Sequence, residues 1–170
     1  MRNEWHRGEF RDCISEITSG KSVNSVDEQA TGEEVGVLKT SCVYYGYFDP
    51  TENKRVVDAE ETLVKCPAKK GCIVVSRMNT ASLVGASGLI ENDYPNLYLP
   101  DRLWLVSPAP RINVKWFAQV VASPQARKRL SDAASGTSAS MKNIWLYAGK
   151  CKTHRLMRVS EAAAICSLGS

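Results

Sequence analysis

The sequence is poor in histidine and contains no closely spaced pair of cysteines. It has two histidines and six cysteines in 170 residues. No two cysteines have the C-x-x-C spacing and no histidines cluster beside them, so the usual ligand patterns of zinc sites are missing. We therefore expect no bound metal, and free thiols that are mostly buried in strands. The six are Cys13, Cys42, Cys66, Cys72, Cys151 and Cys166.

Long apolar runs are also missing. The first fifteen residues mix charged residues with isolated apolar ones, so no stretch of signal-peptide length lies there, and no later run approaches a membrane span. We expect a cytoplasmic protein without a membrane partner. With 44% hydrophobic and 24% charged residues, the chain can bury one core, so one domain with an appendage is expected.

Motifs of the common nucleic-acid enzymes are absent. The sequence has no Asn-Pro-Pro-Tyr or Asp-Pro-Pro-Tyr motif, no glycine-rich phosphate loop ending in Gly-Lys-Ser or Gly-Lys-Thr, and no paired-carboxylate nuclease signature. An autonomous enzyme therefore does not fit the sequence. We expect a non-catalytic protein that binds no cofactor.

Charge is distributed unevenly along the chain. Residues 1–101 contain 11 Lys and Arg against 16 Asp and Glu, whereas residues 102–170 contain 11 against 2. A basic portion of this kind suits a surface that faces phosphates. The alternative is that folding interleaves the two portions into a mixed surface.

Hydrophobic patterning predicts strands first and helices later. Residues 5–17 indicate a short strand or helical turn, and the polar, acidic residues 24–34 indicate an exposed loop. Strands are predicted at 35–43, 63–66, 72–77, 82–90 and 103–106, with a turn at 67–71. Helices are predicted at 114–122, capped by Asn113, and at 125–134, with Pro124 at the first helical position.

This order favours an α+β fold over a repeating βαβ pattern. We expect a twisted, mostly antiparallel sheet with a few flanking helices. Trp5, Trp104 and Trp116 are expected to anchor its core, whereas the environment of Trp145 is left open.

Four stretches, in order, carry a resemblance to a known family. They are residues 5–21 with the Ser-Gly-Lys turn, residues 36–49, residues 70–85 with the Lys-Gly-Cys-Ile-Val-Val-Ser-Arg segment, and residues 99–144. Their order and spacing resemble the target-recognition domain of type I restriction-modification specificity subunits. The resemblance implies a DNA target-recognition domain over residues 1–144, followed by an atypical basic C-terminal tail at 145–170.

The same resemblance implies a function and partners. It indicates sequence-specific recognition of double-stranded DNA, as the specificity component, or half of it, of a phage-defence system that methylates or cleaves DNA. The expected partners are the methyltransferase and restriction subunits. Two departures stand out: Cys72 replaces the aspartate usual in the family, and residues after Ile144 lack the family's long spacer helix.

Candidate DNA contacts fall into three groups of polar residues. Reading a base edge calls for Arg, Lys, Asn, Gln or a hydroxyl, and clamping a phosphate calls for Lys, Arg, Ser or Thr on turns. The groups are Lys21 and Ser22 with Lys39 and Thr40; Arg77, Asn79 and Thr80; and Thr137, Lys142 and Asn143 in a polar loop at 135–143.

Each group also has a structural alternative. The first can be ordinary solvated turns, Arg77 can form an ion pair under its loop, and Asn79 can be a turn former. Arg127, Lys128 and Arg129 occupy successive helical positions, so at most one or two of them face DNA together.

Two other functions stay open at this point. One is a freestanding protein-interaction module that competes with a specificity subunit without binding DNA tightly. The other is an RNA or single-strand binder. It rests only on Tyr44, Tyr45 and Tyr47, which can stack on a splayed base but are more often half core and half surface.

Overall fold

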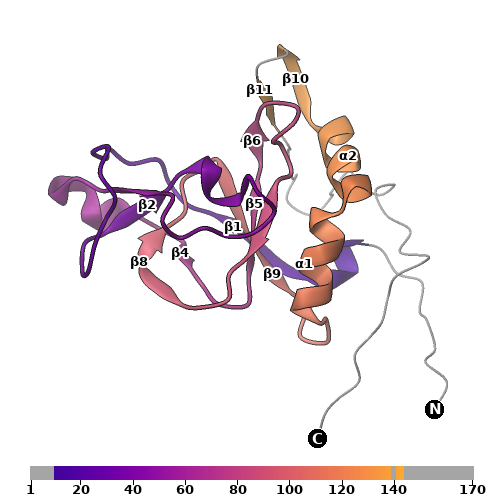
Figure 1. Cartoon of the computed structure of the whole chain (residues 1–170), viewed down its shortest axis with the longest axis horizontal. Helices are drawn as coiled ribbons and strands as arrows, with labels where there is room; N and C mark the ends of the chain where they lie inside the picture. The colour runs from indigo at the N-terminus through magenta and orange to yellow at the C-terminus, as the bar shows by residue number, and fades with distance from the viewer. Residues whose placement is uncertain (1–9, 139–140, 144–170) are drawn as a thin grey trace, which may run out of the picture.

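A computed structural model of the chain describes residues 10–138 and 141–143 (Figure 1). The predicted tail at 145–170, its boundary with the domain, Trp5 and Trp145 lie outside the described residues. In the part described, strands precede two α-helices, so the predicted α+β class is confirmed.

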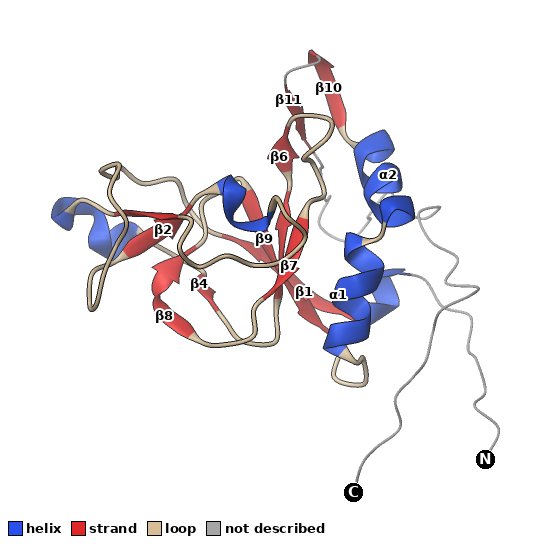
Figure 2. Ribbon diagram, viewed as in Figure 1, coloured by secondary structure: helices blue, strands red, loops and turns tan. Residues whose placement is uncertain are grey.

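The central sheet has four antiparallel strands in the order β1-β9-β5-β7 (Figure 2). The strands are β1 (Ile14–Ser19), β9 (Leu103–Pro108), β5 (Ile73–Ser76) and β7 (Ser87–Leu89). All four residues of β5 are buried, and so are the first four of β9. Apolar residues therefore occupy both faces of these strands, and the sheet is an internal layer.

A second sheet lies beside the first, in the order β3-β2-β8-β4. Its strands are β3 (Asn53–Arg55), β2 (Gly36–Leu38), β8 (Tyr94–Tyr98) and β4 (Pro67–Ala68). Only β2 and β8 run parallel among the paired strands of the described chain, so the prediction of mostly antiparallel pairing is confirmed. We call this sheet, with the 20–34 loop and the 3-10 helix η3 (Asp58–Leu63), the acidic lobe.

A third, small sheet projects from the top of Figure 1 in the order β10-β11-β6. It consists of β10 (Ser135–Ser138), β11 (Met141–Asn143) and β6 (Met78–Asn79), all antiparallel. We call it the hairpin sheet. Its strands come from two segments about sixty residues apart in sequence, so its formation depends on long-range pairing.

The two helices cover the side of the central sheet opposite the acidic lobe (Figure 2). Helix α1 spans Val114–Ala122, and the Asn113 side chain accepts a hydrogen bond from the Trp116 amide. Helix α2 spans Pro124–Ala133, with Pro124 in its first turn and the Ser123 hydroxyl accepting from the Ala126 amide. Both predicted helices and their start signals are confirmed.

Two apolar clusters form the core, one on each face of the central sheet. Val74, Leu103 and Leu105 point into the first, with residues of the acidic lobe and of the 3-10 helix η2 (Thr40–Val43). Ile73, Val75 and Trp104 point into the second, under α1 and α2. Successive side chains of β5 and β9 point to opposite faces, so these two strands contribute to both clusters and connect the acidic lobe to the helices.

Several predicted elements are corrected by the structure. The strand predicted at 35–43 stops at Leu38 and continues as η2; the strand predicted at 63–66 is not formed, and the chain pairs instead at β4, inside the predicted turn. The strand predicted at 82–90 is confined to β7, because residues 81–85 form a turn. In each of these cases long-range pairing, rather than local propensity, selects the strand. The strand or helical turn predicted at 5–17 is confirmed in its described part, which is the short 3-10 helix η1 (Phe10–Cys13) followed by β1.

The cysteines in the described chain are free thiols. Cys13, Cys42 and Cys72 are buried and Cys66 is half-buried, but none of the four lies in a strand, which corrects that part of the prediction. Burial raises the pKa of the Cys13, Cys42 and Cys66 thiols, so these three stay protonated at neutral pH. Among residues 10–138 and 141–143, no helix has the length and apolar character needed to span a membrane.

Candidate nucleic-acid interface

Arg77 leaves the central sheet at the end of β5. Ser76 pairs with Leu103, so the chain leaving β5 runs beside the chain entering β9, and the Arg77 amide donates to the Arg102 carbonyl at 3.1 Å. The Arg77 guanidinium lies 5.7 Å from the centre of the Trp104 ring. Because Trp104 is buried in the sheet, this cation-π contact fixes the direction of a half-buried cation.

Asn79 lies on β6 at the centre of a neutral hydrogen-bond network. Its side-chain nitrogen donates to the Tyr44 hydroxyl at 3.1 Å and to the Ser76 hydroxyl at 3.2 Å. Its side-chain oxygen accepts from the Thr80 amide at 2.9 Å. Thr40 extends the network, since its hydroxyl lies 3.0 Å from that of Tyr44. A bidentate contact to adenine needs one amide hydrogen, so Asn79 has to release Tyr44 or Ser76 to make it.

The hairpin sheet joins two of the predicted groups. Lys142 pairs with Asn79, and Asn143 pairs with Met78. The Lys142 ammonium donates to the Ser131 carbonyl at 3.0 Å, in the last turn of α2, where a cation complements the helix dipole. The predicted loop at 135–143 is therefore wrong: its described residues form β10 and β11, and Thr137 lies on β10.

Helix α2 is attached to the turn that follows β6. Arg127 donates to the Ser82 carbonyl at 2.6 Å, and the Ser131 hydroxyl donates to the Ala81 carbonyl at 3.0 Å. A shallow groove of about 420 Å³ runs between this turn and the helix. The attaching role of Arg127 and Ser131 is absent from the sequence prediction, although their i, i+4 spacing places both on one helix face.

Positive charge predominates in the segment that forms β9, both helices and the β10–β11 hairpin. Residues 102–143 contain seven Lys and Arg and one acidic residue, Asp132. Lys128 pairs with Asp132 at 2.8 Å on the exposed face of α2. An exposed pair of this kind exchanges readily with other partners, so Lys128 stays accessible to an anion.

The acidic lobe holds the remaining predicted residues in a different setting. The Ser22 hydroxyl donates to the Asp101 carboxylate at 2.5 Å. Lys21 lies close enough to Glu60, and Lys39 close enough to Asp27, to help lower the pKa of each carboxyl group. In the Ser-Gly-Lys turn, a Cβ on Gly20 would lie 1.5 Å from the Leu99 carbonyl oxygen. Packing therefore requires that glycine.

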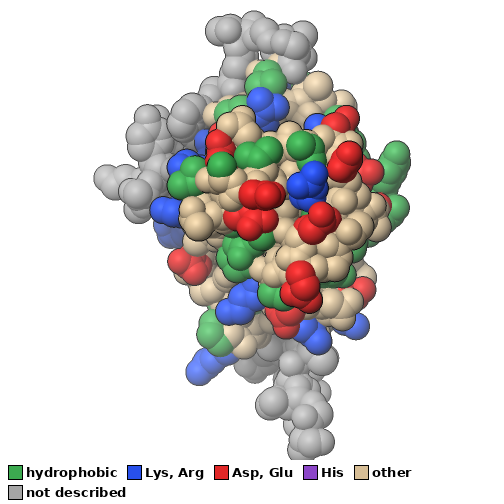
Figure 3. Space-filling view, turned by 90° about the vertical axis from the view of Figure 1, so that its left-hand side faces the viewer, with side chains coloured by type: hydrophobic (Ala, Val, Ile, Leu, Met, Phe, Trp, Pro, Cys, Tyr) green, Lys and Arg blue, Asp and Glu red, His purple; other side chains and the backbone are tan. Residues whose placement is uncertain are grey.

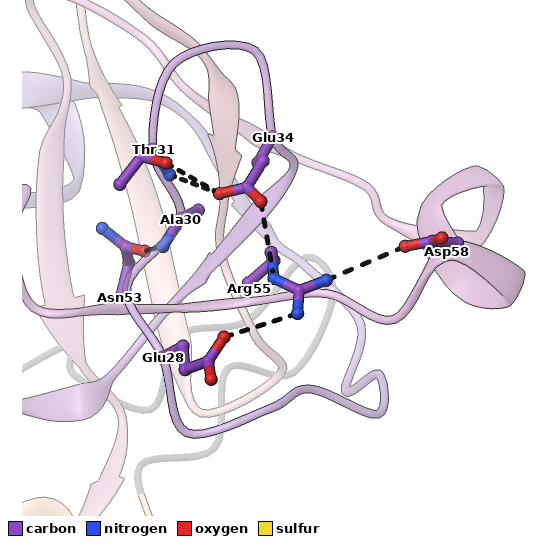
Figure 4. A network of polar contacts seen from close by, with 7 residues as sticks. All are labelled: Glu28, Ala30, Thr31, Glu34, Asn53, Arg55 and Asp58. Carbon is purple, nitrogen blue, oxygen red and sulfur yellow. Dashed lines mark hydrogen bonds and ion pairs between the residues drawn. The ribbon is translucent and has the colours of Figure 1, made fainter.

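Arg55 closes the polar 24–34 loop onto β3 (Figure 4). Its guanidinium pairs with Glu28 and Glu34 at 3.5 Å and with Asp58 at 3.9 Å. Beside it, the buried Asn53 side chain accepts from the Ala30 amide at 2.9 Å. The predicted exposed loop is thus tied down by polar contacts, and Figure 3 shows acidic side chains spread among basic and apolar ones over this face.

Hydrogen bonds lower the pKa of three carboxyl groups in the acidic lobe. The Thr31 amide and hydroxyl donate to Glu34 and lower the pKa of its carboxyl group, and Arg55 adds to the effect. The Asn24 amide and side chain lower the pKa of Glu60, and a bond from Lys54 lowers that of Asp27. These carboxylates stay ionised at neutral pH, so the lobe keeps its negative charge.

The structure therefore divides the predicted contacts. One set lies on or beside the hairpin sheet, and the other borders the acidic lobe. The first set is Thr40, Arg77, Asn79, Thr80, Thr137, Lys142 and Asn143, and the second is Lys21, Ser22 and Lys39. In the described part of the chain, no three His, Cys, Asp or Glu residues are grouped as metal ligands would be.

Comparison with known proteins adds a likeness of fold. No family model and no curated protein matches the sequence. Among solved structures, the S subunit of a type I restriction-modification system from M. genitalium matches with a TM-score of 0.52 and 14% identity. The match covers 84% of this chain and 32% of that one, so this chain spans about a third of the length of the S subunit. At this identity the match shows a shared α+β fold.

Proposed function

We propose that this chain recognises a DNA sequence as the specificity component, or half of the component, of a type I restriction-modification system. The observation that carries the proposal is the hairpin sheet. Two groups of residues predicted separately as DNA contacts, Arg77 to Thr80 and Lys142 with Asn143, are paired there across β6 and β11. The fold shared with an S subunit supports the same function.

Charge and shape support duplex DNA as the ligand. The hairpin sheet projects from the body beside α2, and its outer pair, β10 and β11, is a two-stranded ribbon narrow enough to enter a major groove. Lys142 and the basic residues of α2 supply phosphate contacts on one side. Arg77 and Asn79 supply side chains suited to guanine and adenine edges.

The proposed role is non-catalytic and needs partners. One recognition module buries too little surface for tight specific binding at physiological salt. Methyltransferase and restriction subunits would supply the chemistry, and a second recognition unit would supply the other half-site. We expect micromolar-range binding by this chain alone, without methylation or cleavage of DNA.

Selection from a random duplex pool at two salt concentrations tests the proposal. The predicted result is enrichment of one short half-site, with affinity that falls as salt rises because phosphate contacts release counterions. No enrichment, or binding to methyltransferase subunits alone, would contradict it. The second outcome would favour a protein-interaction module that competes with a specificity subunit.

Repeating the selection with Asn79→Ala tests the proposed base contact. If Asn79 reads a base edge, preference is lost at one position of the site and kept elsewhere. Lys142→Met provides the contrast, because loss of a phosphate contact weakens all sequences by a similar factor. An unchanged selected site for Asn79→Ala would limit Asn79 to holding Tyr44 and Ser76 in place.

A further inference from the structure

Two tyrosine rings stand out of the surface near the candidate interface. The Tyr45 side chain is 80% exposed and that of Tyr47 is 56% exposed, which makes them the two most exposed large hydrophobic residues in the described chain. Their ring centres lie 6.2 Å apart and their planes differ by 24°, so the rings stack on each other. The pair presents a flat apolar surface to solvent.

The segment that carries the rings is held firmly. The Asp49 amide donates to the Cys42 carbonyl at 2.8 Å, closing the segment at its base. Phe48 packs against Tyr94 with ring centres 5.6 Å apart. A Cβ on Gly88 would lie 2.4 Å from the Phe48 amide nitrogen, so β7 and this segment touch backbone to backbone. The backbone that carries the exposed rings is therefore fixed by contacts within the protein.

Tyr44 connects this segment to the hairpin sheet. Its hydroxyl receives the hydrogen bond from Asn79, and Asn79 is the β6 partner of Lys142. The nearest carboxylate along the segment, Asp49, accepts bonds from the amide and hydroxyl of Thr51. Tyr45 thus directly follows, in the sequence, a residue that is bonded to the hairpin sheet. The one carboxylate of residues 44–49 is already hydrogen-bonded.

We propose that Tyr45 and Tyr47 stack against a base step of the duplex, while Tyr44 only fixes their position. The inference rests on the proposed function and adds aromatic contacts to it. Aromatic faces bind every base, and insertion is easiest at flexible pyrimidine–purine steps. The pair would thus favour a deformable step in or beside the selected site, without reading a base edge.

The test uses the full chain and the duplex selected by the wild type. Adenines within and beside the site are replaced, one at a time, by the fluorescent analogue 2-aminopurine. We expect fluorescence to rise at one step on binding, since stacking on the rings separates neighbouring bases. Tyr45→Ala with Tyr47→Ala should lower affinity roughly tenfold and abolish the rise. The salt dependence should not change, because the rings release no counterions.

Two control variants and three contradicting outcomes complete the test. Tyr45→Phe with Tyr47→Phe keeps both rings and should restore affinity and fluorescence, and Leu63→Ala, an exposed apolar residue of the acidic lobe, should match the wild type in both. Wild-type affinity and fluorescence in the alanine pair would overturn the inference while leaving the proposed function intact. Lost binding to methyltransferase subunits with unchanged DNA binding would overturn it in favour of a protein contact. A wild type that selects no duplex would remove both proposals.

Discussion

The acidic lobe and the hairpin sheet use polar residues in opposite ways. In the acidic lobe, carboxylates of Glu28, Glu34 and Asp58 surround Arg55 and close a loop onto β3. At the hairpin sheet, Asn79 bonds to the neutral groups of Tyr44, Ser76 and Thr80, and cations lie on the adjoining α2. In the first region cations and carboxylates pair with each other, whereas in the second Arg127 and Lys142 donate to neutral carbonyl groups.

The two regions also differ in what lies beneath them. The helices beside the hairpin sheet are attached through an apolar cluster that contains the fully buried Phe117, whose ring centre lies 5.0 Å from that of Phe10. The 24–34 loop of the acidic lobe is held mainly by exposed hydrogen bonds and ion pairs, which individually stabilise a fold little. Substitutions should therefore act on stability in one region and on local order in the other.

The largest effect is expected from Phe117→Ala. Removing a fully buried ring should cost about 3–5 kcal/mol of unfolding free energy, from lost burial and the cavity left behind. Denaturant unfolding followed by circular dichroism measures it. Arg55→Met is the comparison in the acidic lobe and should cost about 1 kcal/mol or less. Equal losses in the two variants would contradict the difference between the regions.

Charge reversal should separate the two regions by their effect on DNA. Lys128→Glu with Arg129→Glu on α2 should weaken binding of all duplexes roughly tenfold or more and reduce the salt dependence. Lys69→Glu with Lys70→Glu is the matched control, because those lysines are exposed at the opposite end of β5 from Arg77. Fluorescence anisotropy at several salt concentrations gives both quantities. A larger loss in the control would reverse the assignment of the interface.

The smallest effect is a local response to acid in the acidic lobe. The pKa values of Asp27, Glu34 and Glu60 are lowered in the fold, so their contribution is present above the ordinary values of 3.8 and 4.5 and is lost as pH falls through and below them. The amide signals of Asn24 and Thr31, which donate to Glu60 and Glu34, should shift over this range.

Ala30 provides the control for that titration. Its amide donates to the uncharged Asn53 side chain, so its signal should change little over the same pH range. Nuclear magnetic resonance of the amide groups follows all three residues in one experiment. Equal shifts at Ala30 and Thr31 would mean that the whole loop opens, rather than that single carboxylate contacts are lost.

Local signals in the sequence predicted local structure well. Asn113 and the Ser123-Pro124 pair define where the helices begin, because capping depends on residues within one turn. Apolar content also identified β9 as a strand, since its first four residues are buried in the centre of the sheet. The α+β class follows from the order of these elements along the chain.

What the sequence could not predict depends on contacts between distant segments. The pairing of β6 with β11 decides that residues 141–143 form a strand, and no local pattern encodes that partner. The same is true of the Asn79 to Tyr44 bond, which spans 35 positions. For the site, the groups around Arg77 and Lys142 were predicted separately, but their meeting and the attachment of α2 through Arg127 were not.

The most direct test of the central claim is a titration of the isotope-labelled chain with its selected duplex, followed through the amide signals of both regions. The account predicts the largest shifts at residues 77–80, 127–131 and 141–143, and the smallest at 24–34 and 53–58. The largest shifts in the acidic lobe, or no shifts at saturating duplex, would contradict DNA recognition through the hairpin sheet.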